Sequence, residues 1–219
     1  MTAARTSTVE PQYEEHVKLK QARGVTRLGI EKSANWHSDP RRLLFVLSRY
    51  KFVAKMFSGK GRVLEVGCGD AFPLPIVLQE VAAVHAIDID PVFIADIEER
   101  LDDKWPFTYE VHDMLTGPVS QPPFEAAYSL DVLEHIPVER EHRFLRNVSD
   151  SLLPTGELII GMPSLESQAY ASPGSKVGHI NCKSAPALKS LLNEFFHSVF
   201  MFSMNDEVVH TGYHPMAQY

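Results

Sequence analysis

The stretch "VLEVGCGDAF", residues 63–72, constrains the fold more than any other part of the sequence. Its apolar start is typical of a buried strand, and Gly67 and Gly69 follow that strand directly. Glycine allows tight turns and a close approach of the backbone to a ligand, and a helix pattern follows the turn. The amides and positive end of that helix would point at a bound molecule. We therefore expect a strand–turn–helix unit with a ligand site; a tight turn without a ligand is the alternative.

Strand and helix patterns alternate through the rest of the chain. The expected strands are 62–67, 84–90, 107–113, 124–131, 156–164 and 198–204. The expected helices after the first strand are 74–81, 92–101, 138–153 and about 185–195. Strands separated by helices need crossover connections, which favour a parallel sheet covered on both faces. The sequence predicts an α/β fold, a Rossmann-like, doubly wound, mostly parallel sheet in a single domain.

The first 60 residues differ from the alternating pattern and predict an N-terminal arm with helices. The first dozen residues are small and polar, a short helix is expected at 13–23, and a long helix at 38–57 is capped by Ser38 or Asp39. Segments here and in the unpatterned stretch 165–183 are expected to fold over the ligand cleft. We divide the chain into an arm with lid helices, 1–60, and a main domain, 61–219.

Composition narrows the range of partners. The net charge of -7 and the pI near 5.8 argue against nucleic acid, which usually requires a basic face. Neither a run of about 18 apolar residues nor a charged-then-apolar leader is present, so we expect a soluble, cytoplasmic protein without a membrane span. Two cysteines, Cys68 and Cys182, predict neither a disulfide framework nor structural zinc, and we expect no metal site.

The strand ends carry acidic side chains that suit a particular kind of ligand. Asp88, about twenty residues beyond the glycine turn, can accept hydrogen bonds from both hydroxyls of a ribose. Asp113 can accept from an exocyclic amine such as N6 of adenine, with Met114 against the ring; a solvated acidic strand end is the alternative. Glu65 and Asp70 flank the turn, and this negative surrounding favours a cationic ligand over a pyrophosphate.

These motifs together resemble the class I S-adenosylmethionine-dependent methyltransferases. The resemblance runs from Arg62 to Ser164 through "VLEVGCGDAF", "AIDIDP", "VHDML", "YSLDVLEHIP" and "LLPTGELIIGMPS". It implies S-adenosylmethionine as cofactor and an acceptor loop at about 165–183. The implied cofactor contacts are Glu65, Gly67 and Gly69 for the methionine portion, Asp88 for the ribose, Asp113 with Met114 for the adenine, and Leu130 or Asp131 for the amino group.

The acceptor expected from this resemblance is a hydroxyl of a small molecule, with a sugar or nucleotide-linked sugar as one candidate. The chain has "LDVLEH" where enzymes acting on base or glutamine amines carry an "NPPY" or "DPPY" turn. His135 and His179 are the candidate general bases, and capping a helix or bonding a backbone carbonyl is their structural alternative. Lys32, with Arg41 and Arg42 of the long helix, could clamp one phosphate of a nucleotide-linked sugar; a solvated helix face is the alternative for the arginines.

Two other functions compete with methyl transfer. An NAD(P)-dependent oxidoreductase shares the fold, but Phe72 stands where a dinucleotide fingerprint expects a third glycine. A catalytically silent subunit that binds S-adenosylmethionine is the other alternative.

The carboxyl end of the chain predicts an incomplete sheet. The family pattern adds a final strand after "SVFMFSM", residues 198–204, and we expect that strand to be missing from this chain rather than formed by "EVVHTGY". An unpaired edge at 198–204 would favour a homodimer.

Overall fold

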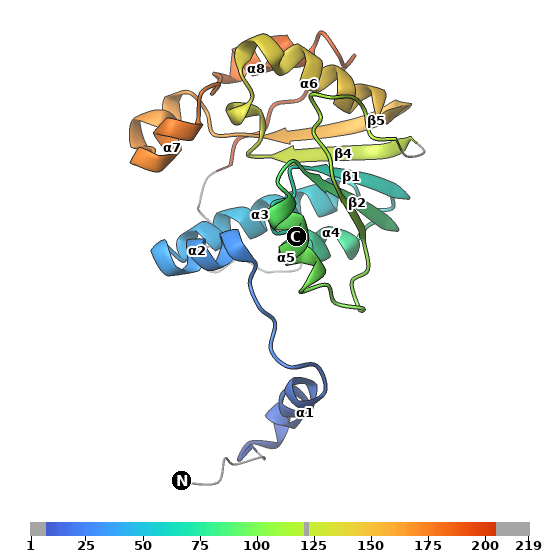
Figure 1. Ribbon diagram of the computed structural model, residues 1–219, viewed down its shortest axis with the longest axis vertical. Coiled ribbons are helices and arrows are strands. Elements are labelled where there is room, and N and C mark those ends of the chain that lie inside the picture. Colours follow the sequence, from blue (N-terminus) through green and yellow to red (C-terminus); the bar gives the residue numbers. More distant parts are fainter. Residues whose placement is uncertain (1–7, 121–122, 205–219) are drawn as a thin grey trace, which may run out of the picture.

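A five-stranded parallel sheet organises the protein, seen in a computed structural model that describes residues 8–120 and 123–204 (Figure 1). Its strand order is β3-β2-β1-β4-β5. The strands are β1 (Arg62–Val66), β2 (Ala83–Asp88), β3 (Thr108–Val111), β4 (Phe124–Leu130) and β5 (Leu152–Gly161). The chain order reverses between β1 and β4, and in such sheets ligands bind at this switch point. The predicted Rossmann-like fold is confirmed.

Helices cover both faces of this sheet, as predicted (Figure 1). The α-helices are α1 (Glu14–Arg23), α2 (Ile30–Ser38), α3 (Arg41–Met56), α4 (Leu74–Leu78), α5 (Pro91–Glu98), α6 (Val138–Asp150), α7 (Pro173–Gly178) and α8 (Ala185–Leu192). Short 3-10 turns are η1 (Pro11–Tyr13), η2 (Leu133–His135) and η3 (Glu166–Tyr170). Helices α3, α4 and α5 pack on one face, and α6 and α8 pack on the other.

The core consists of two layers because alternate side chains of each strand point to opposite faces. In β1, Val63 packs with Val53 of α3 and Leu74 of α4. Its neighbour Leu64 packs on the other face with Leu145 of α6 and Leu188 of α8. The central strands are therefore apolar on both faces, which is the pattern of a fully covered parallel sheet.

The helix starts follow the capping signals in the sequence. Asp90 Oδ1 accepts a hydrogen bond from the Val92 amide at 2.9 Å at the start of α5. Asp39 Oδ1 accepts one from the Arg41 amide at 3.2 Å before α3, whereas Ser38 instead ends α2. The α1 helix buries none of its side chains and extends away from the sheet (Figure 1).

The predicted strand at residues 198–204 is wrong. The structure gives this segment no strand, and Phe200 and Phe202 are exposed. Phe202 contacts Phe52 of α3 with ring centroids 5.1 Å apart, so the apolar alternation serves a contact with a helix. The proposed dimer edge loses its basis, because this segment is not a strand. The predicted absence of a final strand, with "EVVHTGY" as its alternative, lies outside the described residues.

In the described part of the chain, none of the helices combines the length and the apolar character that crossing a membrane requires.

The packing of α6 predicts a large effect of core truncation. Leu145→Ala should lower the free energy of unfolding by about 2–5 kcal/mol, because a fully buried leucine leaves a cavity against β1. Arg143→Ala, on the exposed side of the same helix, is the control and should change it by less than about 0.5 kcal/mol. Urea unfolding monitored by circular dichroism measures both. Equal effects would contradict the two-layer core.

Candidate functional site

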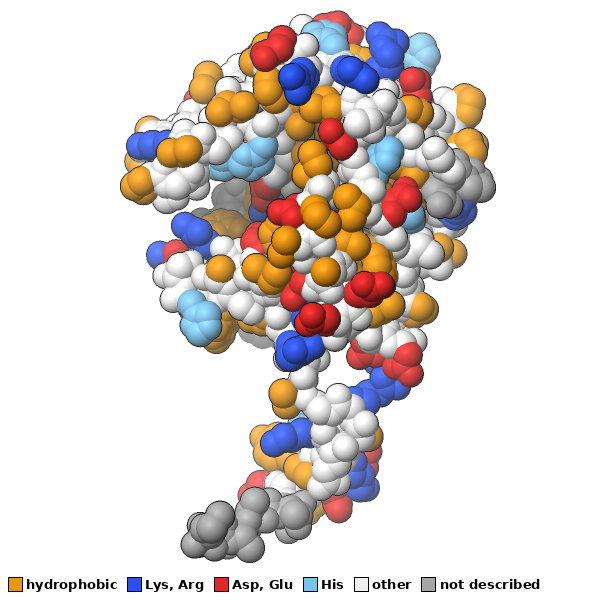
Figure 2. All heavy atoms as spheres, in the orientation of Figure 1, with side chains coloured by type: hydrophobic (Ala, Val, Ile, Leu, Met, Phe, Trp, Pro, Cys, Tyr) orange, Lys and Arg blue, Asp and Glu red, His pale blue; other side chains and the backbone are white. Residues whose placement is uncertain are grey.

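A cavity of about 550 Å³ lies at the carboxyl ends of the strands, around the switch point between β1 and β4. The surface of the molecule is hollowed between α2 and α7, on the side where these helices lie (Figure 2). The lining includes eight of the ten residues predicted to bind the cofactor or act in catalysis: Gly67, Gly69, Asp88, Asp113, Met114, Leu130, Asp131 and His135. Of the predicted site residues, only Glu65 and His179 lie outside this lining as described.

The glycine turn forms the floor of the cavity. Gly67 and Gly69 have φ of 77° and 52°, a backbone region that strains other residues. A Cβ atom on Gly67 would lie 2.2 Å from Cγ2 of Val132, which follows β4. The Gly69 amide donates to Asp88 Oδ2 at 2.8 Å. The turn therefore contacts the ends of both neighbouring strands, β2 and β4. The close approach to Val132 leaves no space for a side chain at Gly67.

Asp88 ends β2 with its carboxylate engaged by the backbone. Oδ2 accepts from Gly69, and Oδ1 accepts from the Asp90 amide at 2.9 Å. A carboxylate offers about four lone-pair sites, so two remain for ligand hydroxyls. These bonds fix the carboxylate at the cavity wall, where Asp88 is a lining residue.

Asp113 and Met114 follow β3 at the other end of the cavity. Asp113 Oδ1 accepts a hydrogen bond from the Leu115 amide at 2.7 Å, and the Met114 carbonyl accepts one from Asn147 Nδ2 at 2.5 Å. Met114 is buried, and Ile89 and Leu115 add apolar lining. This end therefore combines apolar surface with one carboxylate, which suits a planar ring carrying an amine.

The two acids that flank the glycine turn hold the N-terminal helices. Glu65 is buried and accepts a hydrogen bond from the Tyr50 hydroxyl of α3 at 2.5 Å. Asp70 Oδ2 accepts from the Lys32 amide of α2 at 2.8 Å, and Lys32 Nζ lies 3.7 Å from Asp70 Oδ1. Both carboxylates thus join the turn to α2 and α3.

Lys32 does not serve as the suggested phosphate clamp. Its side chain is buried, and Nζ lies 2.6 Å from Glu31 Oε2 as well as near Asp70. A lysine neutralised by two carboxylates has little charge left for a phosphate. The sequence analysis also missed Tyr50, since a tyrosine in an amphipathic helix gives no sign of a distant buried partner.

Leu130 and Asp131 end β4 beside the cavity. Asp131 has φ of 58°, and its Oδ1 accepts from Arg49 NH1 of α3 at 2.5 Å. The pair is only partly exposed, so the charges are incompletely screened. Arg49, which the sequence analysis missed, joins α3 to the end of β4.

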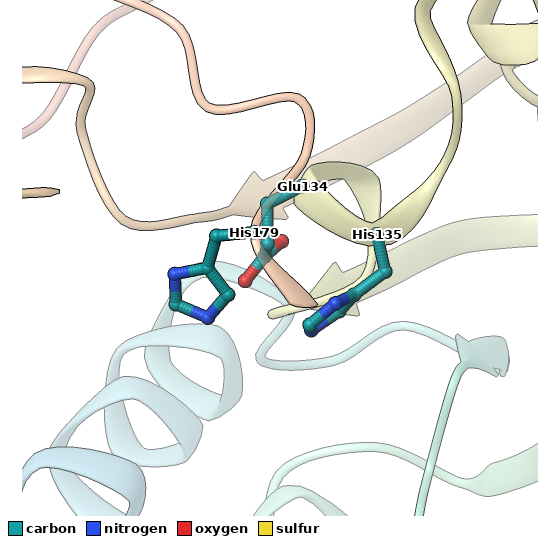
Figure 3. Close-up of side chains that lie close together, drawn as sticks. All are labelled: Glu134, His135 and His179. Carbon is teal, nitrogen blue, oxygen red and sulfur yellow. The ribbon is translucent and has the colours of Figure 1, made fainter. Parts of the chain in front are cut away.

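His135 and His179 approach each other beside the cavity (Figure 3). Their ring centroids lie 5.3 Å apart although the residues come from η2 and from the turn after α7. Nδ1 of His135 lies 2.8 Å from the Gly178 carbonyl, and Nδ1 of His179 lies 3.0 Å from Gln168 Oε1. The two predicted histidines are therefore brought together. Burial, followed by the charge of His135, lowers the pKa of His179.

Glu134 completes this group and was missed by the sequence analysis. It is fully buried, and neither carboxylate oxygen has a hydrogen-bond partner among the described residues. Burial, and then the nearby Asp131 carboxylate, raise the pKa of Glu134 to about 8. One possible ligand atom on each of Glu134, His135 and His179 lies within 4.8 Å of the other two. The only signal for Glu134 in the sequence was its position directly before His135, a candidate general base.

The segment 165–183, the predicted acceptor loop, is anchored at its end by a buried polar network. Asn181 Nδ2 donates to Glu141 Oε2 of α6 at 2.7 Å, and Lys183 Nζ lies 2.8 Å from the same oxygen. The Asn181 amide donates to the Glu134 carbonyl at 2.9 Å. These contacts place His179 close to η2.

Similarity to known proteins supports the observed fold, and the sequence match includes the glycine turn. Residues 63–156 match a sequence family described as "Methyltransferase domain". The phosphoethanolamine N-methyltransferase of Plasmodium falciparum (isolate 3D7) is 27% identical over 100 residues. That alignment covers 45% of this chain and 38% of the relative, so the chain matches less than half of the relative's length.

Solved structures share the fold at low identity. The N-methyltransferase NodS from Bradyrhizobium japonicum WM9, in complex with S-adenosyl-L-homocysteine, is 18% identical with a TM-score of 0.58. That match covers 72% of this chain and 79% of NodS. The structure described as a DhpI-SAM-HEP complex is 18% identical over 86% of this chain and 90% of that one, with a TM-score of 0.57. The mitomycin 7-O-methyltransferase MmcR is 18% identical over 80% and 56%, with a TM-score of 0.56.

Buried Glu65 predicts a stability difference that depends on pH. Burial raises its pKa to about 7, although the Tyr50 hydrogen bond favours the charged form. The folded protein therefore holds a proton that the unfolded chain releases near pH 4.5, and stability falls as pH rises from about 4.5 to 7. Glu65→Gln should remove this fall, which amounts to about 3 kcal/mol.

Urea unfolding of both proteins at several pH values, without ligand, measures this difference. Glu139→Gln, at an exposed position of α6, is the matched control and should follow the native protein. Parallel stability curves for Glu65→Gln and the native protein would show that the Glu65 carboxylate titrates normally.

Proposed function

We propose that the protein is a class I S-adenosylmethionine-dependent methyltransferase that methylates a hydroxyl group of a small-molecule acceptor, because residues 63–156 match a family described as "Methyltransferase domain" and contribute to a Rossmann-like parallel sheet. The observation that carries this proposal is the position of the histidine pair, His135 and His179, beside the cavity at the switch point. A sugar or nucleotide-linked sugar is the acceptor class we favour.

The cavity suits S-adenosylmethionine in its charge and shape. Its described lining contains four carboxylates, whereas its lysine and its arginine, Lys32 and Arg49, are both paired with acids. Such a surrounding favours a ligand that carries an ammonium and a sulfonium. Its volume lies within the usual range for small-molecule sites. We propose that Gly67 and Gly69 lie along the methionine portion and that Leu130 and Asp131 lie near the amino group.

The remaining parts of the cofactor have proposed partners along the strand ends. Asp88 would accept both ribose hydroxyls through its free lone pairs, and Asp113 would accept from the adenine amine beside Met114. Glu65 would act on the methionine portion from beneath the turn through its bond to Tyr50, since it does not line the described cavity.

S-adenosylmethionine supplies, when bound, a methyl group on a sulfonium that leaves as a neutral thioether. The protein must align the acceptor and remove its proton. The Gly178 carbonyl can only accept, so Nδ1 of His135 is the donor and Nε2 keeps a free lone pair. We propose that this nitrogen receives the acceptor proton, with His179 as the second candidate.

The N-terminal region and the acceptor loop would enclose the acceptor. Residues 1–60 would form the arm and lid, because α2 and α3 contribute Glu31, Lys32 and Arg49 to the cavity wall. Residues 61–219 would form the cofactor-binding domain with the acceptor loop at 165–183. An oxidoreductase is disfavoured by the family match and by Phe72 at the third glycine position, and a silent subunit by the histidine pair.

Removing charge from Asp88 should weaken cofactor binding. Asp88→Asn keeps an oxygen for the Gly69 amide but loses charge-assisted acceptance from the ribose, so Kd for S-adenosylmethionine should rise about tenfold or more. Asp113→Asn should have a smaller effect. Isothermal titration calorimetry measures both, and Asp150→Asn at an exposed position of α6 is the control. An unchanged Kd for Asp88→Asn would remove the ribose assignment, and binding of NAD instead would overturn the function.

The histidine pair should affect turnover rather than cofactor affinity. The acceptor is first identified by incubating the protein with S-adenosylmethionine labelled at its methyl group and a panel of sugars, nucleotide-linked sugars and phenols. With that acceptor, His135→Ala should lower kcat by about 100-fold or more while Kd for the cofactor changes little. Equal losses in both quantities would make His135 a structural residue. Label transferred only to amines would overturn the hydroxyl assignment.

A further inference from the structure

We propose that Glu134, His135 and His179 form a binding site for a divalent transition-metal ion of the Zn²⁺ class. The three residues converge from η2 and from the end of α7, and the Glu134 carboxylate lies between the two imidazole rings (Figure 3). Two imidazoles and one carboxylate make a ligand set that zinc enzymes use, with a further position open for water or substrate.

The hydrogen bonds of the two histidines leave the same nitrogen free on each ring. Nδ1 of His135 donates to the Gly178 carbonyl at 2.8 Å, and Nδ1 of His179 donates to Gln168 Oε1 at 3.0 Å. Each Nε2 therefore carries a lone pair. Histidines that bind metals usually donate their other ring N–H to an oxygen in this way, which fixes the tautomer and the ring.

The burial of Glu134 is an independent indication of a cation. Its side chain is fully buried, and neither oxygen has a hydrogen-bond partner among the described residues. Burying an unpaired carboxylate is costly, so such a group either keeps its proton or binds a cation, and a metal ion would replace that proton. Arg49, a nearby cation, is already paired with Asp131. A divalent ion between Glu134 and the histidines would supply the missing partner.

The spacing is compatible with an ion bound by all three residues. The ligand atoms lie within 4.8 Å of one another, and bonds of about 2.0–2.2 Å place tetrahedral neighbours about 3.4 Å apart. A movement of His179 toward η2 by at most about 1.5 Å would therefore be enough. His179 lies in a loop, where such a movement meets less resistance than in the sheet.

Imidazole ligands favour Zn²⁺, Co²⁺ or Fe²⁺ over Mg²⁺ and Ca²⁺, which prefer oxygen ligands. An ion at this place would have an open position toward the acceptor. An acceptor oxygen bound there loses its proton more readily, to water at the open side of the site. In the metal-bound protein His135 and His179 would hold the ion, and the role as general base proposed above would apply to the metal-free protein. This role rests on the proposed methyl transfer, but the binding of the ion does not.

Metal binding is tested on the full chain without an acceptor. After removal of metals with a chelator, the protein is dialysed against Zn²⁺ and its metal content measured by mass spectrometry; Co²⁺ provides a visible absorption spectrum. The native protein should bind one equivalent, and His135→Ala and His179→Ala should each weaken binding about tenfold or more. The matched control is His142→Ala, which removes the histidine of an exposed pair with Glu194 and should bind normally.

Glu134→Gln keeps the shape of the side chain and gives a second readout through thermal unfolding. Zn²⁺ should raise the Tm of the native protein and of His142→Ala but not that of Glu134→Gln. Absence of a bound ion, or binding that His179→Ala leaves unchanged, would overturn the site.

Activity measurements separate this inference from the proposed function. A bound ion without methyl transfer to any acceptor would refute the function and leave the metal site intact. Methyl transfer at an unchanged rate by protein that binds no Zn²⁺ or Co²⁺ would refute the metal site and leave the function intact.

Discussion

The contact between Val132 and Gly67 joins the end of β4 to the turn after β1. A Cβ atom at Gly67 would meet the valine at 2.2 Å, so the approach depends on glycine and on its positive φ. This contact places η2, with Glu134 and His135, directly beside the glycine turn. The cavity, its acidic wall and the histidine pair all depend on these two strand ends lying so close together.

The acidic residues near the glycine turn have two different structural roles. Asp88 and Asp113 line the cavity, whereas Glu65 and Asp70 are buried beneath it and bind Tyr50 of α3 and Lys32 of α2. The stretch 63–72 thus lines the cavity through its glycines and also provides attachment points for the helices that cover it. A ligand that displaces the turn would also change the bonds that hold α2 and α3.

The five strands of the sheet and the residues at their ends could be predicted from the sequence, because strand patterns and glycine turns are local signals. The prediction failed at 198–204, where apolar alternation serves Phe202 against a helix instead of a strand edge. It also gave no sign of Arg49 or Tyr50, whose partners lie 82 and 15 residues away. Glu134 could not be predicted from the sequence. It stands out because it is buried without a hydrogen-bond partner among the described residues, and burial is visible only in the folded structure.

The acceptor loop is closed at its base by a parallel bridge between Ser164 and Lys183, where the Leu165 amide donates to the Lys183 carbonyl at 2.9 Å. Lys183 is also paired with Glu141 of α6. The two ends of the loop therefore lie side by side at this bridge, so the loop forms a separate segment between them. Evolution or protein engineering can therefore replace its interior while the sheet and its two core layers keep their packing.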